Sequence, residues 1–172
     1  RRIVPLRTAS LASVLGAGLL AAACGGDAPP PRGPDIAVLI IDDFGDTLRF
    51  TPPAQRVVSL NPVTTELLFA LEVGDRLVGR TSWDLFPEAA KAVPDLGAGM
   101  GPNVEAVMGQ RPDLVLLYAS ESNRAAVQQL RAAGIATLTY RTDKVADLPR
   151  VIGPIAEVLG VPSVGQLVAD SV

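Results

Sequence analysis

The side chains that could carry chemistry are few in this chain, and their types favour binding over catalysis. The 172 residues contain no histidine and a single cysteine, Cys24. Within these residues, a histidine-built metal site, a Ser-His-Asp triad, an internal disulfide and a CxxC motif are therefore excluded. Trp83, the sole tryptophan, and Tyr118 remain as candidates for ligand contact. A flat aromatic ring on a rigid sheet edge can press on a planar macrocycle or chelate at little entropic cost.

Charged residues suggest two further hypotheses, each with a plainer alternative. Asp42, Asp43 and Asp46 lie close together and could attract a cation. Aspartates at a hairpin turn serve its backbone N–H groups, and we favour that interpretation. Arg80 and Arg141 follow predicted strands and could meet an anionic ligand, although we expect salt-bridge or solvated roles for them. The net charge of −3, from 15 basic and 18 acidic side chains, gives no basic footprint for nucleic acid.

The segment Gly97-Ala-Gly-Met-Gly101 superficially resembles a dinucleotide-binding loop. It lacks the full G-x-G-x-x-G pattern, and no acidic residue follows at the right distance. The chain also contains no P-loop motif. A doubly wound enzyme lobe, chelatase-like or nucleotide-using, is therefore kept only as an alternative.

Strand and helix signals alternate from residue 37 onward. Residues 37–50, with Gly45 between acidic residues, are typical of a β-hairpin. Strands are predicted at 56–60, 76–80, 113–118 and 135–140. Helices are predicted from a cap at Asn61 to a stop at Gly74, and over 87–93, 103–111, 122–133, 146–159 (kinked or broken at Pro154) and 162–172. This alternation predicts an α/β domain, doubly wound around a mostly parallel sheet, with ligands at the carboxyl ends of the strands.

The N-terminal segment has the pattern of a bacterial lipoprotein signal. Arginines at 1, 2 and 7 precede an apolar run over 9–23, which at 15 residues is short for a membrane span. The run ends at Leu20-Ala-Ala-Ala-Cys24, which resembles a lipobox. We therefore expect residues 1–24 to be a signal peptide with acylation at Cys24. An ordinary signal peptide with an incidental cysteine is the alternative. Residues 25–35, with four prolines, are expected to form a tether.

Four motifs in order resemble one protein family. They are Arg56-Val-Val-Ser-Leu-Asn-Pro-Val-Thr-Thr-Glu66, Val78-Gly-Arg-Thr-Ser-Trp83, Asn103-Val-Glu105 and Arg111-Pro-Asp-Leu-Val115. Together with the lipobox, they resemble the N-terminal lobe of cobalamin- and iron-siderophore-type substrate-binding proteins of ABC importers. The resemblance covers about three quarters of the chain, from near Ile41 onward.

The resemblance implies a fold and a function. Two α/β lobes would hold a ligand between them, with residues 36–160 as the N-terminal lobe and 161–172 as the start of the helix that connects to a second lobe. The protein would be a membrane-anchored lipoprotein of the bacterial envelope, facing the periplasm or the cell exterior. It would capture cobalamin or a ferric siderophore and deliver it to an ABC permease and its ATPase, without catalysis and without a cofactor. Corrinoid, siderophore and heme all remain open as ligands.

The resemblance also implies roles for individual residues. Asn61, Trp83, Met100 and Tyr118 would contact the ligand, and Glu66 would dock onto arginines of the permease. The plainer interpretation of Glu66 is a solvated glutamate near a helix start, where the helix dipole favours it. For the whole chain, an adaptor lipoprotein without a transport role is a further alternative.

Overall fold

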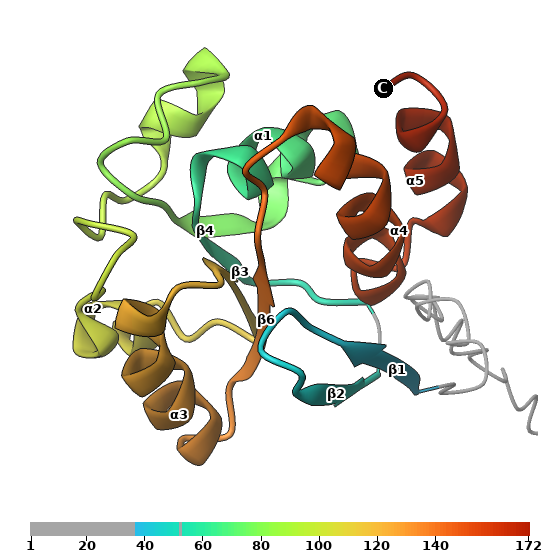
Figure 1. The fold of residues 1–172 in the computed structure, drawn as a ribbon. Coiled ribbons are helices and arrows are strands. Elements are labelled where there is room, and N and C mark those ends of the chain that lie inside the picture. The colour runs from blue at the N-terminus through green and yellow to red at the C-terminus, as the bar shows by residue number, and fades with distance from the viewer. Residues whose placement is uncertain (1–36, 52) are drawn as a thin grey trace, which may run out of the picture. The chain divides into compact units, whose positions relative to one another are not determined.

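The computed structural model describes residues 37–51 and 53–172, and its centre is a parallel four-stranded sheet (Figure 1). The strands are β3 (Val57–Leu60), β4 (Leu77–Gly79), β5 (Leu114–Tyr118) and β6 (Ala136–Tyr140), in the order β4-β3-β5-β6. The two inner strands, β3 and β5, are almost wholly buried. Their near-continuous apolar sequences fit strands that are covered on both faces. The predicted doubly wound α/β fold is confirmed.

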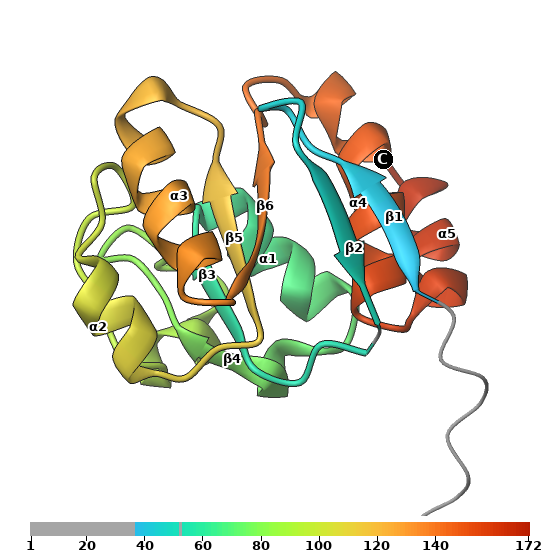
Figure 2. The ribbon, with the colours of Figure 1, turned by 90° about the horizontal axis from the view of Figure 1, so that it is seen from below.

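Helices cover both faces of the sheet (Figure 2). Helices α1 (Pro62–Ala70) and α4 (Leu148–Val158) pack on one face, and α2 (Val104–Gly109) and α3 (Arg124–Ala132) on the other. The side chains of β5 alternate between the two cores. Leu114 and Leu116 join α1 and α4, whereas Val115 and Leu117 join α2 and α3. Because successive side chains of a strand point to opposite faces of the sheet, β5 contributes to both hydrophobic cores.

Two helices, α1 and α4, differ from their sequence-based predictions. The N-terminal cap of α1 is as expected, since Asn61 Oδ1 accepts a hydrogen bond from Val63 N at 3.0 Å. The helix ends at Ala70, however, and Glu72 adopts the left-handed backbone with φ of 60°. Gly74 is not the stop, and its small size instead admits the ring of Phe69, with which a Cβ would collide. Helix α4 runs without a break through Pro154, because its buried apolar residues hold it against the sheet.

Helix α5 (Pro162–Ala169) is shorter than the predicted 162–172 and lies beside α4. Its Gly165 faces Ala156 so closely that a Cβ there would collide with the alanine methyl group. Whether this helix continues toward a second lobe, as the resemblance implies, stays a prediction. In the described part of the chain, no helix combines the length and the apolar character that crossing a bilayer requires. The predicted signal peptide and tether, residues 1–35, lie outside the described residues.

The hairpin of β1 (Val38–Ile41) and β2 (Thr47–Phe50) is antiparallel, as predicted. The buried Asp42 accepts hydrogen bonds from the backbone of Phe44 and Asp46, both at 3.0 Å, so the turn interpretation is confirmed for Asp42. The carboxylates of Asp43 and Asp46 pair with arginines instead. Asp42 also accepts from Thr139 Oγ1 at 2.6 Å and pairs with Arg131 at 3.0 Å. Arg131 pairs with Asp46 as well. These contacts fasten the hairpin to β6 and α3.

We expect Arg131→Ala to destabilise the fold by about 3 kcal/mol, because it leaves the fully buried carboxylate of Asp42 without its cation. The change in the free energy of unfolding can be measured by urea denaturation. Lys91→Ala is the control, since it removes an exposed pair with Glu88 and should cost less than about 0.5 kcal/mol. Equal effects of the two variants would contradict this role for Arg131.

Candidate functional site

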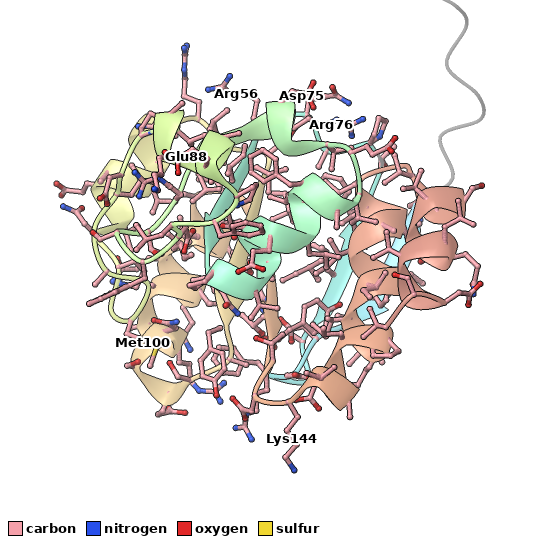
Figure 3. All side chains as sticks on the ribbon, turned by 90° about the horizontal axis from the view of Figure 1, so that it is seen from above. Arg56, Asp75, Arg76, Glu88, Met100 and Lys144 are labelled. Atoms are coloured by element: carbon pink, nitrogen blue, oxygen red, sulfur yellow. The ribbon has the colours of Figure 1, made fainter. Side chains whose placement is uncertain are left out.

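The loops that follow the four parallel strands meet at one edge of the sheet. Figure 3 shows Lys144, just after β6, at this carboxyl edge, with Met100 toward the same side. Arg56, just before β3, and Arg76, just before β4, mark the opposite edge. In doubly wound folds, ligands are bound outside the carboxyl ends of the strands, so the search for a site begins there.

A cavity of about 270 Å³ opens at this edge. It brings together the four residues that were predicted to contact ligand, namely Asn61, Trp83, Met100 and Tyr118. The rest of its lining is small or apolar: Leu60, Pro62, Thr81, Ala98 and Gly99. The residues come from the ends of β3 and β5, the loop after β4 and the glycine-rich loop before α2. Residues as far as 58 positions apart in the sequence, Leu60 and Tyr118, thus line one cavity.

Two large apolar side chains of this cavity are left open to solvent. Trp83 is 71% exposed and Met100 is 52% exposed. A tryptophan that closed the core beneath a loop would be buried, so Trp83 does not have that structural role. An exposed indole and thioether beside a cavity form an apolar surface that a ligand or a facing domain could cover.

Asn61 and Tyr118, the polar residues among the predicted ligand contacts, both form hydrogen bonds beside the cavity. The buried amide of Asn61 caps α1 and donates from Nδ2 to Thr142 Oγ1 at 3.0 Å, so both ends of the amide are already engaged. Tyr118 donates from its hydroxyl to Asp143 at 2.5 Å. This hydrogen bond to a carboxylate, with a smaller contribution from burial, raises the pKa of Tyr118, so the phenol is neutral at physiological pH. Asp143, which follows β6, was not anticipated from the sequence.

The arginines that follow the strands take structural roles. Arg80 is buried and donates to the carbonyls of Thr81 at 2.8 Å and Ala90 at 3.0 Å. It also lies 3.7 Å from Asp95, so the salt-bridge interpretation is confirmed for this residue. Arg141 is exposed and donates from Nε to the carbonyl of Ala119 at 3.3 Å. Neither arginine lines the cavity.

Glu66 lies apart from the cavity. It is exposed on α1, and its side chain forms no hydrogen bond or ion pair with any residue in the described part of the chain. It borders a separate, mainly apolar hollow of about 600 Å³ whose walls include Phe69, Phe86 and Val145. The two hollows share no lining residue. The structure thus separates the predicted docking residue from the predicted ligand contacts.

No resident metal centre is evident in the described part of the chain. Residues 37–51 and 53–172 contain no group of three or more His, Cys, Asp or Glu side chains placed to hold an ion. The cavity offers an amide, two hydroxyl groups and apolar surface. This arrangement can hold and orient a ligand, and it presents no nucleophile paired with a base.

Comparison with known families decides the class of the chain. A family model described as "Periplasmic binding protein" matches residues 57–170, more than half of the chain. The chain belongs to the periplasmic binding protein family. The match begins at β3 and runs through α5, so it includes every cavity residue and Glu66. The resemblance inferred from the sequence is confirmed.

Individual periplasmic binding proteins give the same result. The chain is 36% identical over 138 residues to an ABC transporter substrate-binding lipoprotein of Bacillus subtilis (strain 168), covering 74% of the chain and 43% of that protein. It is 39% identical over 110 residues to the vitamin B12-binding protein of Yersinia pestis (strain Pestoides F), covering 62% and 36%. The apo periplasmic heme-binding protein RhuT of Roseiflexus sp. RS-1 matches with a TM-score of 0.63 and 30% identity, over 69% of the chain and 46% of RhuT. The chain spans less than half the length of these relatives.

Proposed function

We propose that this chain supplies the N-terminal, ligand-binding lobe of a substrate-binding lipoprotein of an ABC importer. The ligand is a metal-centred macrocycle, a corrinoid or heme, or a ferric siderophore. It is captured between this lobe and a second one and then delivered to the permease. The metal arrives within the ligand as cargo, and no protein metal ligand is required. The protein performs no catalysis.

The observation that carries this proposal is the convergence of Trp83, Met100, Tyr118 and Asn61 on one cavity at the carboxyl edge of the sheet. An exposed indole offers its flat face to a planar ligand through dispersion and apolar burial. Relatives that bind vitamin B12 and heme support the macrocycle class. A cavity of about 270 Å³ is small for a ligand of this size, which fits a site completed by a facing lobe.

Equilibrium dialysis against cyanocobalamin, hemin and a ferric siderophore tests the ligand class. We expect saturable, one-to-one binding of at least one of the three. The affinity of this lobe alone should be orders of magnitude below that of a two-lobed protein, because a one-sided site leaves about half the ligand surface in water. Absence of saturable binding of all three to a two-lobed form would contradict the proposed class.

Glu66 is proposed to dock the lobe onto the permease. It is exposed, borders an apolar hollow and lies outside the ligand cavity. A carboxylate in this setting can form charge-assisted hydrogen bonds with an arginine of a partner, which orient a transient complex. The apolar rim would exclude water from such a pair and strengthen it.

Anchoring through Cys24 is the third element of the proposal. We expect Cys24→Ser, expressed with its signal segment, to leave the membrane fraction, because no acyl chain can then be attached. Fractionation followed by immunoblotting measures the distribution. The unchanged protein should sediment with membranes and be released by detergent. Membrane retention of the variant at the level of the unchanged protein would show that acylation of Cys24 is not the anchor.

A further inference from the structure

One buried carboxylate lies inside the loop that carries Trp83. Asp84 is fully buried, although both of its neighbours, Trp83 and Leu85, are largely exposed. In the described part of the chain it has no cationic partner within salt-bridge distance. An ionised carboxylate away from water is costly unless hydrogen bonds compensate it. Its burial between two exposed residues therefore needs an explanation.

Asp84 is held by three hydrogen bonds from two buried threonines. Thr81 donates from Oγ1 at 2.6 Å and from its backbone N–H at 3.1 Å. Thr65, on α1, donates from Oγ1 at 2.6 Å. The bond to Thr65 spans 19 residues, so it fastens the loop to the helix that opens at the ligand cavity. Hydrogen bonds to an ionised acceptor are among the stronger ones in proteins.

The same network reaches the backbone of Trp83. The N–H of Trp83 donates to Thr81 Oγ1 at 3.2 Å, and that hydroxyl donates in turn to Asp84. The indole of Trp83 has no hydrogen-bond partner among the residues that the structure describes, and most of its surface is open. Its position therefore depends on how its backbone is held. Asp84 is the acceptor on which the local hydrogen bonds converge.

We propose that Asp84 is a positioning residue for ligand binding. It holds the loop so that the indole of Trp83 stands as a fixed wall of the cavity, and the ligand meets a surface that is already ordered. Ordering such a side chain only on binding would reduce affinity. The inference rests on the proposed role of Trp83 as a ligand contact.

The position of Trp83 can be followed without ligand, because it is the sole tryptophan. The tryptophan bands in near-ultraviolet circular dichroism report how rigidly the indole is held. Asp84→Asn keeps the shape but removes the charge, so the hydrogen bond with Thr81 Oγ1 must reverse its direction, and all three bonds lose the strength that an ionised acceptor gives. We expect these bands to fall by about half or more in Asp84→Asn and Asp84→Ala. In Thr65→Val, which removes one donor, they should fall by less. The far-ultraviolet spectrum should be retained.

Asp42→Asn is the matched control. Asp42 is also buried and accepts several hydrogen bonds, but it holds the hairpin at a different place. Asp42→Asn should lower the melting temperature while leaving the tryptophan bands unchanged. If Asp84→Asn and Thr65→Val both keep the bands of the unchanged protein, or if Asp42→Asn reduces them equally, the positioning role is overturned. The Thr65 variant keeps the test decisive if both Asp84 variants fail to fold.

A ligand-binding experiment distinguishes this inference from the proposed function. Dialysis of the full chain against cyanocobalamin and hemin should show binding about tenfold weaker in Asp84→Asn, and unchanged binding in Asp42→Asn. If Trp83→Ala leaves binding of both ligands unchanged, the proposed function of Trp83 fails, whatever the spectra show. If Trp83→Ala weakens binding but Asp84→Asn does not, the positioning role fails alone.

Discussion

Replacing Trp83 with alanine is expected to weaken ligand binding by about thirtyfold or more, an effect typical of a central aromatic contact. The indole is the largest side chain on the cavity wall, and 71% of its surface is free to be covered. Losing it removes apolar area that the ligand would bury. Equilibrium dialysis is a better assay than tryptophan fluorescence, because cobalamin and heme absorb strongly and would quench the fluorescence of a nearby tryptophan without contacting it.

Phe86→Ala is the control for this variant. Phe86 lies three residues further along the same loop and is 66% exposed, but it lines the hollow beside Glu66 instead of the cavity. Its loss should leave the dissociation constant within about twofold of the original. If the two aromatic variants weaken binding equally, the effect comes from the loop as a whole, and Trp83 is not a specific contact.

Replacing Glu66 with alanine is expected to abolish most of the stimulation of ATP hydrolysis that the loaded binding protein gives its permease. Truncating one partner of an interfacial charge pair that is buried on docking costs about 2–5 kcal/mol. Ligand affinity should be unchanged, because Glu66 does not line the ligand cavity. The measurement uses the two-lobed protein with its permease and ATPase reconstituted together.

Glu105→Ala provides the comparison, since Glu105 is an exposed glutamate in the first turn of α2. The Glu105→Ala variant should stimulate ATP hydrolysis as the unchanged protein does. Normal stimulation by Glu66→Ala would favour the plainer interpretation of a solvated glutamate near a helix start. A loss of ligand affinity equal to that of Trp83→Ala would likewise contradict a docking role.

The sequence predicted the framework because its signals are local. Apolar runs such as 113–118 indicate buried strands, and Asn61 followed by Pro62 indicates a helix start with a cap. The predicted ligand contacts also followed from local signals, since each lies at the end of a strand, in the loop that follows one, or in a glycine-rich segment. The resemblance to substrate-binding proteins then supplied the choice of Asn61 and Met100 among the residues at that edge.

The remaining features depend on contacts between distant parts of the chain. Arg131 meets Asp42 across 89 sequence positions, and Asp84 meets Thr65 across 19. Gly74 had the signal of a helix stop, but the close approach of Phe69 explains it better. Pro154 had the signal of a break, but the packing of α4 on the sheet outweighs one missing hydrogen bond.

The central claim, that the cavity at the carboxyl edge is the ligand surface of this lobe, is tested most directly by nuclear magnetic resonance. The chain has one tryptophan, so its single indole N–H signal reports Trp83 without ambiguity. Titration with cyanocobalamin or hemin should shift that signal together with the amides of Gly99 and Met100, and weak binding by one lobe is sufficient for this. The amides of the hairpin, such as Arg49, should not move. Shifts confined to residues outside the cavity, or an indole signal that stays fixed at saturation with a ligand that binds, would contradict the account.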